Sequence, residues 1–181
     1  MTFDEFEASA WSTFGGVEDN PREQLMCSAL GLAGETAEYV ELLKNVPLSR
    51  HQAMLELGDI LFYVAISARV LGVRMEDLPR DDDIVLGDLR VEAGIMPAAV
   101  RLLIVIGTYA DAIKKACFHG HSLDMAHVTW LLGEALSEMT TACVLLGITM
   151  EDVAFANQAK LQARYPDGFS VARSHHRKEV S

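Results

Sequence analysis

The sequence has few of the residues on which disulfide-rich, zinc-binding or nucleic-acid-binding proteins depend. Its three cysteines are an odd number without a Cys-x-x-Cys spacing, which argues against a disulfide framework and against a zinc site. Fifteen Lys and Arg face 26 Asp and Glu, so the net charge is −11. Because nucleic acid and anionic lipid bind to basic surfaces, we expect neither nucleic acid nor a membrane as a partner.

Long hydrophobic runs and targeting signals are also scarce. The N-terminus is acidic, whereas a secretory signal begins with basic residues and continues with apolar ones. The most apolar stretches, near residues 60–73 and 98–107, are interrupted by Arg69 and Arg101 and are shorter than a membrane span. Half of the residues are hydrophobic, which is enough for a sizeable core. We therefore expect one soluble, cytoplasmic domain over residues 1–181.

Strand signals are nearly absent and helix signals are frequent. The sequence has no Asn-Gly hairpin turn and no sustained alternation of apolar and polar residues. Capping residues, stop signals and apolar residues at three- and four-residue spacing predict long helices. These helices cover about residues 20–44, 49–72 and 122–147, and one more begins after Thr149. The expected fold class is all-α.

The chain also resembles itself. Leu-Gly-Val-Arg-Met-Glu-Asp at residues 71–77 recurs 75 positions later as Leu-Gly-Ile-Thr-Met-Glu-Asp. Further upstream, residues 34–44 align with residues 104–114 or in a register shifted by three, and the sequence does not choose between them. We interpret the chain as a helical bundle of two tandem hairpins, about 20–79 and 95–170, that form an internal pseudo-dimer.

Four carboxylates form the main candidate site. Glu35 and Glu38 are spaced i, i+3, as are Glu56 and Asp59, so each pair lies on one face of a helix. The two helices are joined by a short turn, which predicts antiparallel neighbours with the four side chains at similar heights. Four anions repel one another unless cations hold them together, and oxygen ligands without His or Cys suit Mg²⁺ or Mn²⁺. The alternative is that these residues form ordinary solvated faces of acidic helices.

The segments GLAGETAE at 31–38 and ELGDILFY at 56–63 resemble the motifs of MazG-like all-α nucleoside triphosphate pyrophosphohydrolases, relatives of the dimeric dUTPases. The resemblance continues in KKACFHGH at 114–121 and ANQAKLQARYPDGF at 156–169, and it is missing from roughly residues 80–97. It implies hydrolysis of a nucleoside triphosphate, in a homo-oligomer, to the monophosphate and pyrophosphate. It also implies that Mg²⁺, which Mn²⁺ can replace, is bound by Glu35, Glu38, Glu56 and Asp59. We expect one of these carboxylates, Glu38 by preference or else Glu35, to orient the attacking water as well, although the sequence does not separate metal ligand from base.

The family features are divided between the two repeats. At the offset of 75, the second repeat has Leu131 and Glu134 in place of Glu56 and Asp59, and the first repeat lacks the Asn-x-x-Lys pair. We therefore expect one composite site per chain, with metals bound by residues 35–59. The expected phosphate or substrate contacts are Asn157, Lys160, Arg164, Lys114 and Tyr165.

Several assignments have plain structural alternatives. The stripe of residues 157, 160 and 164 is solvated in the simplest case, and Lys114 lies at a helix C-terminus, where cations are favoured in any case. Tyr165 either touches substrate or packs the helix end. Trp11 and Phe14 either stack on a base or pack in the core. The base stays open among dGTP, dUTP, dCTP and damaged nucleotides, and the alternative function is a catalytically silent binding or regulatory module.

Overall fold

The protein is seen in a computed structural model that describes residues 1–15, 20–45, 47–80, 89–166 and 169. Within these residues the structure is helical and contains no strand, which confirms the predicted all-α class. The helices are α1 (Phe3–Thr13), α2 (Pro21–Leu42), α3 (Arg50–Val70), the 3₁₀ helix η1 (Met75–Asp77), α4 (Leu89–Glu92), α5 (Ile95–Phe118), α6 (Met125–Leu146) and α7 (Met150–Arg164).

The long helices begin at the residues whose side chains cap them. Asn20 accepts from the backbone N–H of the second residue of α2 at 3.0 Å, and Ser49 accepts from the third residue of α3 at 3.2 Å. Thr149 forms a reciprocal capping box at the start of α7. Helix α6 ends at Gly147, whose φ of 64° is the left-handed conformation that glycine adopts at low cost. The predicted helix boundaries are therefore confirmed to within a few residues.

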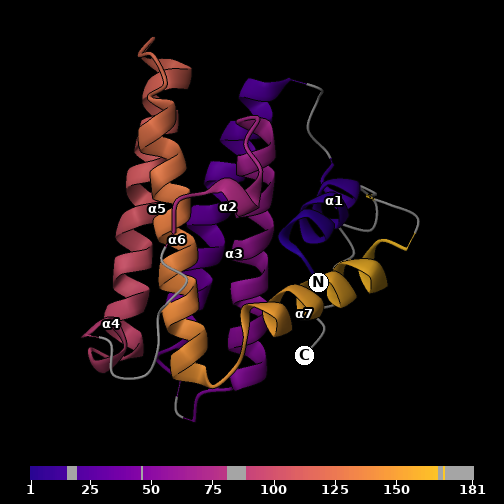
Figure 1. The fold of residues 1–181 in the computed structure, drawn as a ribbon, viewed down its shortest axis with the longest axis vertical. Coiled ribbons are helices and arrows are strands. Elements are labelled where there is room, and N and C mark those ends of the chain that lie inside the picture. Colours follow the sequence, from indigo (N-terminus) through magenta and orange to yellow (C-terminus); the bar gives the residue numbers. More distant parts are fainter. Residues whose placement is uncertain (16–19, 46, 81–88, 167–168, 170–181) are drawn as a thin grey trace.

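Two helical hairpins make up the body of the protein (Figure 1). Helix α2 pairs with α3, α5 pairs with α6, and α2 also packs against α5. Helices α1 and α7 lie across α3. Apolar side chains from all four long helices are fully buried between the hairpins, and burial of each contributes about 1.5–3 kcal/mol. Examples are Leu32, Leu57, Ile106 and Leu132.

Helices α2 and α5 show the same burial pattern at an offset of 70 residues. Tyr39 and Tyr109 are both fully buried. An exposed ion pair follows each tyrosine and is formed by the residues two and five positions after it. These pairs are Glu41 with Lys44 and Asp111 with Lys114. The pattern selects the unshifted alignment of residues 34–44 with 104–114, which the sequence had left open.

The hairpins also exchange contacts at two equivalent glycines. A Cβ added to Gly58 of α3 would lie 2.8 Å from the Cβ of Asn157 in α7. A Cβ added to Gly133 of α6 would lie 1.8 Å from the carbonyl oxygen of Pro79, in the segment that follows α3. Each hairpin is thus crossed at the same position by the segment that follows the other hairpin. The tandem-repeat interpretation predicts this reciprocity, and the duplication itself stays a prediction.

Helix α5 differs from the sequence-based expectation in one respect. In the described part of the chain it is long and apolar enough to cross a membrane by length and composition, and only 28% of its most apolar window is buried in the protein. Helices α6 and α7 are long and apolar enough to cross a membrane only when they are taken together, and they are bent by 98° relative to each other. Arg101 interrupts the apolar residues of α5, and its Nε donates to Oε1 of Glu138 at 2.8 Å. Helix α5 therefore exposes a long apolar face.

Candidate functional site

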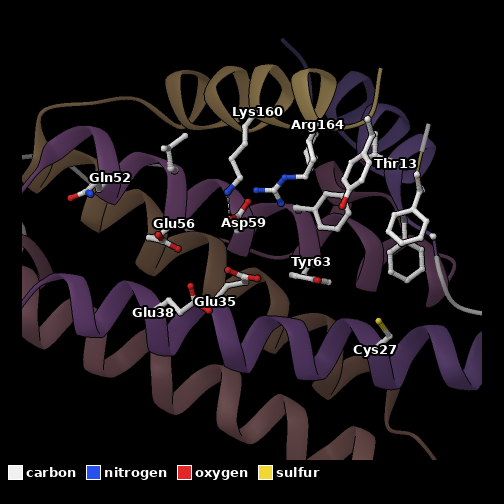
Figure 2. A pocket seen from close by; sticks show the side chains of 17 residues that line it. Thr13, Cys27, Glu35, Glu38, Gln52, Glu56, Asp59, Tyr63, Lys160 and Arg164 are labelled. Carbon is white, nitrogen blue, oxygen red and sulfur yellow. Dashed lines mark hydrogen bonds and ion pairs between the residues drawn. The ribbon is translucent and has the colours of Figure 1, made fainter. Parts of the chain in front are cut away.

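Helices α1, α2, α3 and α7 surround a cavity of about 410 Å³, a size typical of small-molecule sites (Figure 2). Its two ends differ in chemistry. Gln52, Glu38 and Glu56 lie toward one end, and Thr13 and Cys27 lie toward the other (Figure 2). Aromatic side chains from three stretches of the chain also line the cavity: Phe14, Phe62, Tyr63, Tyr165 and Phe169.

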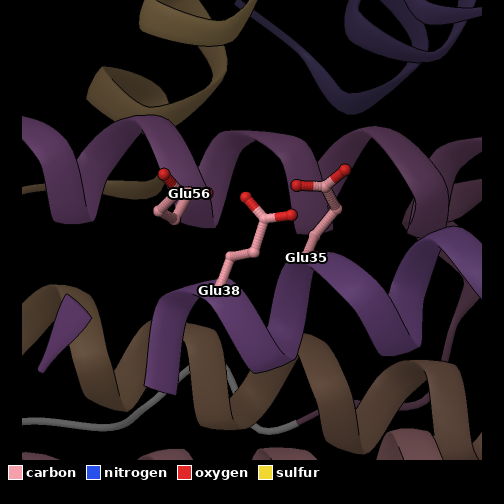
Figure 3. Close-up of side chains that lie close together, drawn as sticks. All are labelled: Glu35, Glu38 and Glu56. Atoms are coloured by element: carbon pink, nitrogen blue, oxygen red, sulfur yellow. The ribbon is translucent and has the colours of Figure 1, made fainter. Parts of the chain in front are cut away.

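Three of the four predicted metal ligands converge at the acidic end (Figure 3). Glu35, Glu38 and Glu56 each offer one carboxylate oxygen, and these atoms all lie within 4.8 Å of one another. The i, i+3 spacing places two of them on one face of α2, and the antiparallel packing of α3 brings the third opposite. In an octahedral Mg²⁺ site with metal–oxygen distances of about 2.1 Å, the ligand oxygens lie about 3–4 Å from one another. Small rotamer changes would bring the three glutamate oxygens to these distances, so the group could hold a divalent cation.

The fourth carboxylate, Asp59, lines the same cavity but is bound to α7. Its Oδ1 accepts from Nδ2 of Asn157 at 2.8 Å. Its Oδ2 pairs with the ammonium group of Lys160 (Figure 2). The close approach at Gly58 makes these contacts possible, because a larger residue there would push α7 away. Asp59 is therefore held in one orientation by two side chains of α7.

The negative charges of the cluster are unfavourable unless a carboxylate is protonated or a cation is bound. Burial raises the pKa of Glu35 to about 7, and the negative charges of Asp59 and Glu38 add to the effect. The pKa of Glu56 is also raised, first by burial and then by Asp59. Lys160 opposes both shifts in part. At neutral pH the cluster therefore retains a proton at Glu35 part of the time, and a divalent cation bound by these oxygens would displace it.

The predicted substrate-contacting residues divide into two groups. Lys160, Arg164 and Tyr165 line the cavity, as expected of residues that touch a ligand. Asn157 is fully buried behind Asp59 and does not line it, so its contact is with the carboxylate and not with phosphate. Lys114 lies on the exposed side of α5 in an ion pair with Asp111, outside the cavity wall. The geometry of one chain therefore does not support a phosphate contact by Lys114.

Several residues of the cavity wall were not expected from the sequence. Gln52 lies one helical turn before Glu56, so the i, i+4 rule was a signal for it. Phe62 lies in the segment 56–63 but was given no role there, and no local sequence pattern indicated Cys27. Of the two aromatic candidates in α1, Phe14 lines the cavity. Trp11 does not, and the guanidinium of Arg69 lies 4.7 Å from its ring centroid.

In α6, acids at or near the positions that the sequence aligns with the carboxylate motifs form ion pairs with arginines. In the selected alignment, Val105 and Thr108 replace Glu35 and Glu38. Glu134 lies 3.6 Å from the guanidinium of Arg90. The neighbouring acid Glu138 is almost fully buried and accepts from Arg101. The charges of these acids are thus balanced by arginines, and too few carboxylates are present there for two divalent ions.

Comparison of this chain with known proteins gives no match. No protein-family model, no curated protein and no solved structure matches it.

Proposed function

We propose that the protein hydrolyses a nucleoside triphosphate to the nucleoside monophosphate and pyrophosphate with the help of a divalent cation. The observation that carries this proposal is the composition of a single cavity. It combines a carboxylate cluster, two cationic side chains and a set of aromatic rings. A metal-bound triphosphate joined to a base needs these three surfaces together. The MazG-like resemblance of residues 31–38 and 56–63 supports the same activity.

The acidic end fits the metal and the water. Glu35, Glu38 and Glu56, with Asp59 beside them, would hold Mg²⁺ or Mn²⁺, which neutralises phosphate charge and lowers the pKa of bound water. Glu38 is the most exposed carboxylate of the cluster and is the best placed to accept a proton from the attacking water. The water oxygen then bonds to the α-phosphorus, the bond from that phosphorus to the α,β-bridging oxygen breaks, and pyrophosphate leaves.

The cations of α7 fit the phosphate chain. Lys160 and Arg164 line the cavity from α7, one helical turn apart. In this position they can donate to non-bridging phosphate oxygens and offset the charge that develops as the α,β bond breaks. Lys160 must then exchange Asp59 for phosphate, so Lys160 serves as the counter-ion of Asp59 until substrate arrives.

The aromatic rings fit a base. Stacking on an aromatic ring contributes about 1–3 kcal/mol per base and accepts any base, because every base has a π face. Phe14, Phe62 and Tyr63 are the best candidates, since their rings are neighbours: the centroids of Phe14 and Phe62 lie 6.4 Å apart, and those of Phe62 and Tyr63 lie 5.1 Å apart. Discrimination between bases would fall to the polar side chains Thr13 and Cys27.

We also infer that each chain carries one active site, built from both halves of an internal pseudo-dimer. The matching burial of α2 and α5 supports the duplication. So do the reciprocal crossings at Gly58 and Gly133. The first repeat contributes the carboxylates and the second contributes Lys160 and Arg164.

A catalytically silent binding module is the second candidate, and one contact favours it. The Asp59–Lys160 pair neutralises part of the acidic cluster without a metal. Such a module would bind nucleotides without cleaving them.

A panel of ribo- and deoxynucleoside triphosphates, incubated with Mg²⁺ and assayed for pyrophosphate, distinguishes the two candidates. We expect stoichiometric pyrophosphate and monophosphate from at least one substrate, and none from the variant Glu38→Ala. Glu134→Gln is the matched control, because it removes a carboxylate from the equivalent region of the other repeat. Binding of triphosphates without any turnover would support the silent module and contradict hydrolysis.

A further inference from the structure

Lys160 and Asp59 form an ion pair in the cavity wall that is largely shielded from solvent. The side chain of Lys160 is 13% exposed and that of Asp59 is 19% exposed. Oδ2 of Asp59 pairs with the ammonium group of Lys160 (Figure 2). Oδ1 of the same carboxylate accepts from Nδ2 of Asn157 at 2.8 Å. Both oxygens of Asp59 are therefore already in contact with a donor from α7.

The glutamates of the cluster differ from Asp59 in this respect. One oxygen from each of Glu35, Glu38 and Glu56 lies within 4.8 Å of the other two, so these three side chains can hold one divalent cation between them. Asp59 lines the same cavity but is not a member of this group. The cation that balances the charge of Asp59 is the ammonium group of Lys160. The cavity therefore offers a ligand set for one divalent ion, while the ligand for a second ion is already paired.

We propose that the ammonium group of Lys160 takes the place of a second divalent cation at Asp59. Lys160 leaves Asp59 only when the phosphate chain of a substrate attracts it, so the protein without nucleotide binds one divalent ion and binds the second together with the triphosphate. The physical reason is that two cations cannot share one carboxylate oxygen at close range, because their repulsion is strong where little water is present to screen it. The inference deepens the proposed function and rests on its metal and triphosphate site.

The exchange requires movement of the Lys160 side chain and not of helix α7. Asn157 is fully buried and holds α7 against α3, since a Cβ added to Gly58 would lie 2.8 Å from the Cβ of Asn157. Lys160 follows one helical turn later, and its charge lies at the end of a flexible four-carbon stem that lines the cavity. A buried charge that loses its partner is costly. The exchange leaves neither charge unpaired, because phosphate takes over Lys160 and the second ion takes over Asp59.

Titration of the nucleotide-free protein with Mn²⁺ tests this exclusion. Electron paramagnetic resonance counts the bound ions, because a bound ion loses the sharp signal of free Mn²⁺. Lys160→Met removes the ammonium group and keeps an unbranched side chain, and the double variant Lys160→Met, Asp59→Asn also removes the carboxylate that Lys160 covers. Lys115→Met is the matched control, because it removes the same charge from an exposed ion pair with Asp111 on α5. Circular dichroism checks the fold of each variant.

A second measurement needs no variant. Wild type is titrated with Mn²⁺ in the presence of the α,β-methylene analogue of the triphosphate that binds best. Two ions in one active site lie about 3.5–4 Å apart, and at that distance their spins couple, which changes the resonance spectrum. This measurement decides the question alone if Lys160→Met loses its helicity.

We expect wild type and Lys115→Met to bind one Mn²⁺ per chain, Lys160→Met to bind two, and the double variant to bind one again. The second ion should bind to Lys160→Met at least about 10-fold more tightly than to wild type. Spin coupling in wild type should appear only with the analogue. Equal numbers of ions in wild type and Lys160→Met, or a coupled pair in wild type without the analogue, would overturn the inference. Hydrolysis by such a protein would leave the proposed function intact, whereas the expected counts without turnover would support the inference and contradict hydrolysis.

Discussion

Replacing Glu35 with glutamine should raise the free energy of unfolding of the metal-free protein. This increase should be present at neutral and higher pH and absent at acidic pH. The pKa of Glu35 is raised from 4.5 to about 7, first by burial and then by Asp59 and Glu38. In the unfolded chain the same carboxyl keeps its ordinary pKa, so it ionises at a lower pH than in the fold. The stability that Glu35 contributes is therefore fully present below pH 4.5 and is lost as the pH rises to about 7. Glutamine mimics the protonated carboxyl and escapes this loss.

The magnitude follows from the size of the shift. A change from 4.5 to about 7, at about 1.4 kcal/mol per pH unit, corresponds to an upper limit of roughly 3 kcal/mol. Glu35 is only partly buried and faces an open cavity, so screening by solvent reduces this to about 1.5 kcal/mol. For a chain of 181 residues, that difference shifts the melting temperature by about 3–6 °C.

Thermal unfolding in EDTA, followed by circular dichroism at pH 5 and pH 8, measures the effect. Glu35→Gln should melt close to wild type at pH 5 and about 3–6 °C higher at pH 8. Glu92→Gln, which changes an exposed glutamate of α4, is the control and should show no such pH dependence. Equal stabilisation at both pH values, or destabilisation at pH 8, would refute the account of the cluster's electrostatics.

Three further substitutions test the proposal that one half of the chain supplies the metal ligands and the other half supplies the phosphate contacts. Lys160→Ala should lower kcat/KM by about 10- to 100-fold, because a charge-assisted contact to phosphate is lost, and steady-state pyrophosphate release measures it. Glu134→Gln should leave kcat/KM within about twofold of wild type in the same assay, since the acids of the second repeat are paired with arginines; a large loss would show a second working site. Asn157→Ala should lower the free energy of unfolding by about 1–3 kcal/mol in urea, because a buried amide that holds Asp59 disappears; unchanged stability would count against that positioning role.

The helices could be predicted from the sequence because their end signals are local. Asn20, Ser49 and Thr149 cap their helices through contacts within three residues, so no knowledge of the rest of the chain was needed. The i, i+3 spacing of the carboxylates is equally local. Together with a short turn between α2 and α3, it was sufficient to predict that Glu35, Glu38 and Glu56 converge.

The remaining features depend on contacts between distant segments. Asn157 and Lys160 share a helix stripe, but only the crossing of α7 over Gly58 buries the first and leaves the second in the cavity. Lys114 lies in one of the segments on which the sequence resemblance was based, yet the packing of α5 places it outside the cavity wall. The alignment of α2 with α5 required the burial of Tyr39 and Tyr109, which composition does not reveal.

The site of water attack tests the central claim most directly. The protein, Mg²⁺ and the best triphosphate of the panel are incubated in ¹⁸O-labelled water, and the products are separated and analysed by mass spectrometry and ³¹P NMR. Attack at the α-phosphorus predicts one ¹⁸O atom in the nucleoside monophosphate and none in pyrophosphate. Label in pyrophosphate or in inorganic phosphate, or the absence of any product, would contradict the proposed function.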